Sequence, residues 1–150
     1  MFRFDSHTAL LQAPPTVPIE EQAVHVYLVN FSILYQNDDT VRVLLPFLVP
    51  MYTNSPDGSA LRVATRAAAL SAISQLPGQN QLTRQATSQY GKAILAVARA
   101  LRDPVESKSD ETLQATLLLG MYEVCMLTSI FATNAEAYVA FRRLRRQTNR

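Results

Sequence analysis

Apolar residues recur along most of the chain at spacings of three and four, which is the period of an amphipathic α-helix. The first such segment begins at Ile19, carries Glu20 and Glu21 in its first turn, and ends at Asn37-Asp38-Asp39. The apolar stretch over residues 41–52 is interrupted by prolines, each of which costs roughly 3 kcal/mol inside a helix. We therefore expect one or two short turns there, packed against the rest of the protein.

Two longer helices are predicted next. The first runs from about Ser59 to Leu76 and stops before Pro77-Gly78. Its alanine-rich surface is apolar on two sides, so we expect it to be the central helix, with close neighbours on both sides. Asn80 is expected to cap the second helix, which reaches about Arg102. The apolar stripe of that helix consists of Leu82, Ala86, Tyr90, Ala93 with Ile94, Val97 and Leu101.

The most regular amphipathic pattern follows Ser109-Asp110-Glu111, which offers a cap and two acids for a helix start. We expect its apolar stripe to face the core, and the stripe consists of Leu113, Leu117, Gly120 with Met121, Val124, Leu127 and Phe131. Asn134 is expected to cap a last helix. The sequence thus predicts an all-α fold, an antiparallel helical bundle or an array of α-α hairpins with about five to six helices.

Length and composition agree with a folded chain of ordinary domain size, since 150 residues are 48% apolar and 17% charged. Prolines at positions 14, 15 and 18 indicate an extended N-terminal linker over residues 1–18. Residues 19–131 are expected to form the helical domain, and residues 132–150 a basic C-terminal helix or tail. No apolar stretch of about 18 residues runs without polar interruption, so we expect no membrane span.

Charge is distributed unevenly, because 5 of the 14 basic residues follow residue 141 and all 12 acidic residues precede it. Arg142, Arg143, Arg145 and Arg146 form a candidate basic contact patch for phosphate, an acidic partner or a nuclear-import receptor. The alternative is a solvated helix end, whose arginines favour the negative pole of the helix dipole.

Few residues in the chain are suited to catalysis or metal binding. His7 and His25 lie far apart in the sequence, and Cys125 is the single cysteine. A zinc site built from several thiolates is therefore excluded, and no ligand spacing indicates another metal. No glycine-rich loop indicates a phosphate-bearing cofactor. We expect no catalytic, cofactor-binding or metal-binding residue, and hence no enzyme.

Glu123 stands out because it follows an apolar run in the helix after Ser109. A carboxylate partly withdrawn from water needs a partner. Arg66 or Arg62 of the central helix, or Tyr90, is expected to supply one. A structural pair between two helices and a ligand contact remain the two alternatives for Glu123, Arg66 and Tyr90.

The order of several segments resembles the regulatory, or middle-homology, domain of fungal binuclear zinc-cluster transcription factors. The resemblance covers about residues 19–127. Its blocks are the helix start at residues 19–24, Leu45-Pro46 and the residues up to Tyr52, the alanine-rich helix at residues 61–71, and the segments at residues 86–101, 103–104, 110–113 and 117–123. The end departs from the family pattern, because residues 132–150 contain neither tryptophan nor histidine.

The resemblance implies a non-catalytic regulatory domain, or a truncated form of one, that acts in the nucleus through a protein partner or a small-molecule effector. The family's zinc-cluster module, which reads DNA, needs more cysteines than this chain has, so autonomous zinc-cluster DNA binding is excluded here. Without the family's downstream helices, the stripe from Leu113 to Phe131 would be partly uncovered, which favours self-association or partner binding. A stand-alone helical interaction module, or a small-molecule-binding protein derived from this domain, is the alternative.

Overall fold

The computed structural model describes residues 17–34 and 47–148, and every regular element within these ranges is helical. The side chains of residues 30–34, 136–138 and 140–148 lie outside this description. The elements in chain order are α1 (Ile19–Leu34), α2 (Leu48–Asn54), α3 (Ala60–Ser74), α4 (Leu82–Ala100), the short 3-10 helix η2 (Glu106–Lys108) and α5 (Asp110–Thr148). The predicted all-α class is therefore confirmed, whereas the linker predicted for residues 1–18 lies almost entirely outside the described residues.

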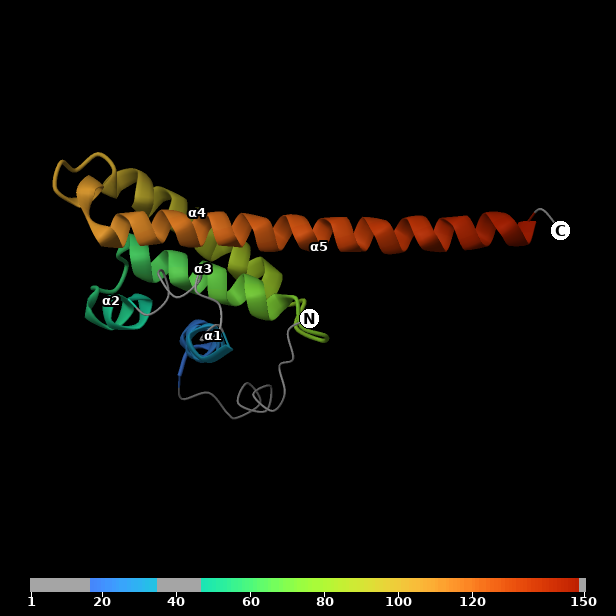
Figure 1. Ribbon diagram of the computed structural model, residues 1–150, viewed down its shortest axis with the longest axis horizontal. Helices are drawn as coiled ribbons and strands as arrows, with labels where there is room; N and C mark the ends of the chain where they lie inside the picture. The colour runs from blue at the N-terminus through green and yellow to red at the C-terminus, as the bar shows by residue number, and fades with distance from the viewer. Residues whose placement is uncertain (1–16, 35–46, 149–150) are drawn as a thin grey trace.

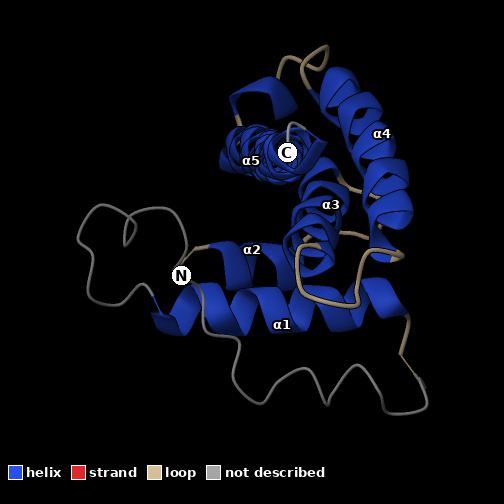
Figure 2. Ribbon diagram, turned by 90° about the vertical axis from the view of Figure 1, so that its right-hand side faces the viewer, coloured by secondary structure: helices blue, strands red, loops and turns tan. Residues whose placement is uncertain are grey.

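The predicted central helix is confirmed as α3, which contacts each of the other α-helices (Figure 2). The helix begins after Ser59, whose hydroxyl oxygen accepts a hydrogen bond from the Arg62 amide at 3.3 Å. It ends before Pro77-Gly78, and Gly78 has a left-handed backbone conformation with φ 79°. Both apolar sides of the predicted helix are covered, although Ala72 is only half-buried. The buried apolar residues of α3 are Leu61, Val63, Ala64, Ala67, Ala68, Ala69, Leu70 and Ile73.

The helices α1 and α2 pack below α3, on the side opposite α5 (Figure 1). The first predicted helix corresponds to α1, and its predicted end at residues 37–39 lies outside the described residues. One of the expected short turns is α2, which contains Pro50 in its first turn, where a missing amide breaks no helical hydrogen bond. Its Leu48 and Tyr52 side chains are buried.

The helix α4 runs beside α3 and begins one residue later than predicted. The Asn80 cap is wrong, since Gln81 precedes the helix and no side chain caps it. Asn80 belongs to the preceding turn, where its carbonyl accepts the Thr83 amide at 3.1 Å. Two members of the predicted stripe, Ile94 and Leu101, are exposed. The face that α4 buries consists of Leu82, Ala86, Ala93, Val97 and Ala100.

The helix α5 is continuous from Asp110 to Thr148 and projects well beyond the body formed by α1 to α4 (Figure 1). Its predicted cap is present, because the Ser109 hydroxyl accepts the Thr112 amide at 3.2 Å. The separate last helix predicted to start at Asn134 is wrong. Neither glycine nor proline occurs after residue 120, so nothing local interrupts the helix. The division of the chain at residue 131 stays a prediction.

Candidate functional site

Only one side of α5 is covered by the body. Among the α5 side chains that the structure describes, the buried ones are Thr112, Gln114, Ala115, Leu118, Leu119 and Tyr122, and this covered side contacts α3 and α4. The stripe that we expected to face the core lies on the other side and is exposed. We call it the outer face of α5, and it consists of Leu113, Leu117, Met121, Val124, Leu127 and Phe131.

The stripe is therefore uncovered, as the family resemblance implied in part, and the expectation from periodicity that it is buried was wrong because α5 carries two apolar faces. At about 100° per residue, Leu113, Val124 and Phe131 point to one side of the helix, and Ala115, Leu118 and Tyr122 to the opposite side. Periodicity shows that both sides are apolar, but it does not show which one the body covers. Val124 is 63% exposed and Phe131 is 70% exposed. Apolar exposure of that extent along one side of a helix is typical of a binding surface.

The same two faces explain a second property of α5. Within the segment from Asp110 to Ala135, a window of 18 residues has a mean hydropathy of 1.6, so by length and composition alone the segment is apolar enough to cross a membrane. The predicted absence of a membrane span is therefore not settled by length and composition. In the fold, however, the segment buries the polar side chains of Thr112 and Gln114 against the body. Inserting it into a membrane would also uncover the α3 residues beneath it.

Glu123 and Tyr90 are brought together where α5 crosses α4. The Tyr90 hydroxyl donates to Glu123 Oε1 at 2.5 Å, and the Tyr90 ring stacks on Tyr122 with 4.2 Å between ring centroids. The hydrogen bond to Glu123, with a smaller contribution from burial, raises the pKa of Tyr90 to about 12. Glu123 is exposed rather than withdrawn from water as expected. The pair therefore lies at the rim of the α4–α5 contact.

Arg66 does not join that pair, because its side chain lies on the other side of α3. Its Nη2 group lies 2.6 Å from Glu21 Oε1 and 2.6 Å from Asp57 Oδ1. Its Nε group also donates to Glu21, at 2.8 Å. The bond to Arg66 holds the pKa of Asp57 below its usual value. Arg62 is not with Glu123 either, since its guanidinium lies 4.7 Å from the centre of the Tyr52 ring.

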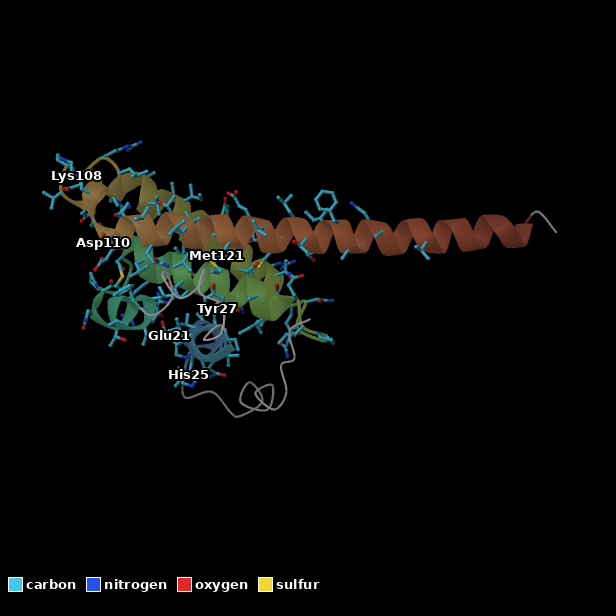
Figure 3. The ribbon with its side chains drawn as sticks, viewed as in Figure 1. Glu21, His25, Tyr27, Lys108, Asp110 and Met121 are labelled. Atoms are coloured by element: carbon cyan, nitrogen blue, oxygen red, sulfur yellow. The ribbon has the colours of Figure 1, made fainter. Side chains whose placement is uncertain are left out.

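Glu21 was not predicted from the sequence to bridge several helices. A carboxylate in the first turn of a helix is favourable by itself, so its charge did not indicate a further partner. In Figure 3 it lies on the side of α1 that faces the body, whereas His25 lies on the outer side. The Tyr52 hydroxyl donates to both carboxylate oxygens of Glu21, at 2.9 Å each. Burial, followed by this hydrogen bond, raises the pKa of Tyr52. The cluster formed by Glu21, Tyr52, Asp57 and Arg66 therefore joins α1, α2 and α3.

The remaining sites predicted from sequence are placed as follows. His25 is exposed on α1, and His7 lies outside the described residues. Cys125 is half-buried, and burial raises the pKa of its thiol. Within the part of the chain that the structure describes, no three histidine, cysteine or acidic residues converge to hold a metal ion. The candidate patch from Arg142 to Arg146 lies on the last turns of α5, with side chains outside the description.

A comparison with protein families gives one match. The family model described as a fungal specific transcription factor domain matches residues 24–146 of the 150-residue chain. The matched region begins within α1 and ends in the last turn of α5, so it includes most of α1 and α5 and all of the helices between them. No curated protein and no solved structure matches the chain.

Proposed function

The chain belongs to the family of fungal specific transcription factor domains, and from this premise we propose that it is a non-catalytic domain that regulates transcription by binding a protein through the outer face of α5. A regulatory role in transcription follows from the family. The interaction surface is our own assignment, and one observation carries it, namely the apolar residues exposed along the side of α5 that the body leaves uncovered.

The outer face suits a protein partner better than a small polar ligand. It is convex, apolar and spread over several helical turns, from Leu113 to Phe131. A surface of this kind fits the apolar side of another helix, because anchors at three- and four-residue spacing interlock with a matching stripe. Polar groups such as Glu123 lie at its edge.

A transcription assay tests this proposal. The chain is fused to an unrelated DNA-binding module, and expression of a reporter gene is compared with that given by the module alone. We expect the chain to change expression, and we expect the double variant Val124→Glu/Leu127→Glu to lose that effect. Glutamate keeps the helix propensity while placing charge on the apolar surface.

Leu95→Glu provides the matched control. Leu95 is an apolar residue of α4 that is 68% exposed, so its replacement adds the same kind of charge away from the outer face. We expect this variant to behave as the parent fusion does. A reporter that responds equally to all three proteins would contradict the assigned surface, and a reporter that responds to none would contradict the regulatory role.

Nuclear localisation is part of the proposal, since transcription is regulated in the nucleus. The arginines between positions 142 and 146 are candidates for contact with an import receptor, because they form a basic cluster without neighbouring acids. A fluorescent fusion is expected to accumulate in the nucleus. Replacing all four arginines with glutamine is expected to reduce that accumulation, and unchanged localisation would assign them to a solvated helix end.

A further inference from the structure

We propose that the outer face of α5 pairs with the same face of a second copy of this chain, with the two helices antiparallel. This inference rests on the proposed function, because it names the partner of the same surface. Its geometry has three parts, namely the spacing of the contact residues, the side of α5 on which they lie, and the sizes and charges that would meet across the pair.

The sequence pattern of the outer face continues beyond the exposed stripe. Starting at Leu113, residues at alternating spacings of four and three form a single line along α5, which we call the α5 seam. It consists of Leu113, Leu117, Gly120, Val124, Leu127, Phe131, Asn134, Tyr138 and Phe141. Seven of these nine residues are apolar or aromatic, and the other two are Gly120 and Asn134. Such a pattern, sustained for about four heptads, is typical of a coiled coil.

From Leu113 to Asn134, where the side chains are described, the α5 seam lies on the side of α5 that faces away from the body. Ala115, Leu118 and Tyr122, which contact the body, point about 180° from the seam at 100° per residue. Figure 2, in which α5 is seen end-on, shows α3 and α4 together on one side of it. A second α5 can therefore lie along this part of the seam while α3 and α4 of each copy stay on the outside of the pair.

Side-chain size favours the antiparallel direction. If the twofold axis lies between Val124 and Leu127, these two residues face each other across the pair, and Gly120 of one copy faces Phe131 of the other. Within its own chain, Gly120 has nothing within 4 Å of the position that a Cβ would occupy. The phenyl ring would fill this open space. A parallel pair would instead place glycine opposite glycine and leave a gap at the interface.

Charge favours the same direction. Between residues 103 and 111 the chain carries four acidic residues and one basic residue, whereas its last nine residues carry five arginines and no acid. An antiparallel pair places the acidic segment that precedes and begins each α5 beside the basic end of the other α5. A parallel pair would place the two arginine clusters side by side, and like charges in contact disfavour association.

Light scattering coupled to size-exclusion chromatography tests the pairing with the full chain. We expect a mass of twice 16.7 kDa for the wild type and for Leu95→Glu. We expect Val124→Glu/Leu127→Glu to give the mass of one chain, with circular dichroism still showing a helical protein. The measurement is repeated over a series of protein concentrations. A wild type that has the mass of one chain at every concentration would overturn the inference.

Gly120→Leu tests the direction of the helices. In the antiparallel pair the added side chain meets Phe131 of the second copy, so we expect dimerisation to weaken by on the order of tenfold or more. Adding Phe131→Ala in the same chain is expected to restore part of the affinity. In a parallel pair the two leucines would meet at the seam and strengthen it, and that result would overturn the antiparallel assignment.

Three further outcomes separate this inference from the proposed function and from binding to a membrane. If the chain is monomeric while the transcription assay still depends on Val124 and Leu127, the outer face binds a different protein and only the self-pairing is overturned. Co-sedimentation of a monomeric wild type with phosphatidylcholine vesicles, lost in Val124→Glu/Leu127→Glu, would instead assign the face to a membrane surface. If the wild type dimerises and the light-scattering and Gly120→Leu experiments both give the expected results, but the chain has no effect on transcription, only the proposed function is overturned.

Discussion

Glu21 links three helices through one carboxylate. It accepts hydrogen bonds from Tyr52 of α2 and from Arg66 of α3, while its own backbone belongs to α1. The Arg66 and Glu21 side chains are only 18% and 28% exposed. Ion pairs in full contact with water contribute little to stability, because solvent screens them. This pair is partly shielded and also hydrogen-bonded through two guanidinium nitrogens, so we expect it to contribute more.

A double-mutant cycle with Glu21→Gln and Arg66→Gln measures that contribution. We expect a coupling free energy of about 1–3 kcal/mol between the two side chains, the range for hydrogen bonds to charged groups. The free energies of unfolding come from urea titrations of the four proteins. Arg84→Gln, at an exposed position of α4, is the control and is expected to change stability little. A coupling energy near zero would show that the contact is incidental.

Glu123→Gln tests the second pair. Because folding raises the pKa of Tyr90 to about 12 from its ordinary 10, the folded chain holds the phenol proton more tightly than the unfolded chain. The stabilisation is present below the ordinary pKa and is lost as the pH rises through the folded value. We expect the variant to lower the pKa of Tyr90 towards 10 and to lose roughly 0.5–1 kcal/mol of stability at neutral pH.

The pKa is measured by tyrosinate absorbance during an alkaline titration. Tyr90→Phe identifies which of the six tyrosines gives the late transition, since that transition should be missing from its titration. If Glu123→Gln leaves both the late transition and the stability unchanged, the hydrogen bond has no structural role, and the ligand-contact alternative for Glu123 gains support.

At the scale of the elements, α3 determines how closely the others pack. Its buried surface is largely alanine, and Ala64, Ala67 and Ala69 are fully covered. Small side chains allow the backbones of two helices to approach each other, so α4 and α5 both lie against the same short helix. Interiors packed in this way leave little room for additional methylene groups.

Ala67→Leu is therefore expected to destabilise the chain by about 1–3 kcal/mol, because the added atoms must displace a neighbouring helix. Thermal and urea unfolding measure the loss. Ala132→Leu is the matched control, since Ala132 is exposed on α5 and its replacement is expected to change stability by less than about 0.5 kcal/mol. Equal effects at both positions would show that α3 is not tightly packed.

The elements themselves could largely be predicted from the sequence. The limits of α3 follow from Ser59 and Pro77-Gly78, which are local signals for the start and the end of a helix. The covered side of α5 could not be predicted, because both of its sides are apolar and only the fold decides which of them meets α3. The partner of Arg66 could not be predicted either. It depends on how α1 lies across α3, which no local pattern in either helix encodes.

For the whole molecule, the arrangement in Figure 1 predicts an uneven distribution of stability. The first half of α5 is packed against the body, whereas Leu127, Ile130 and Phe131 farther along are exposed. Hydrogen exchange followed by mass spectrometry is expected to show slow exchange in α3 and much faster exchange in α5 beyond about residue 127 when the chain is dilute. Equal protection along α5 in a monomeric sample would contradict this.

Because α5 has two opposed faces, the concentration of the chain affects how long each folded chain survives. One face completes the interior with α3, and the other is available for association, but a chain presents either face only while it is folded. Any molecule that occupies the outer side therefore also draws the folding equilibrium towards the native state. If that molecule is another copy, crowded chains persist and sparse chains unfold and are degraded sooner. The cellular dose of the protein would then set its lifetime as well as its number.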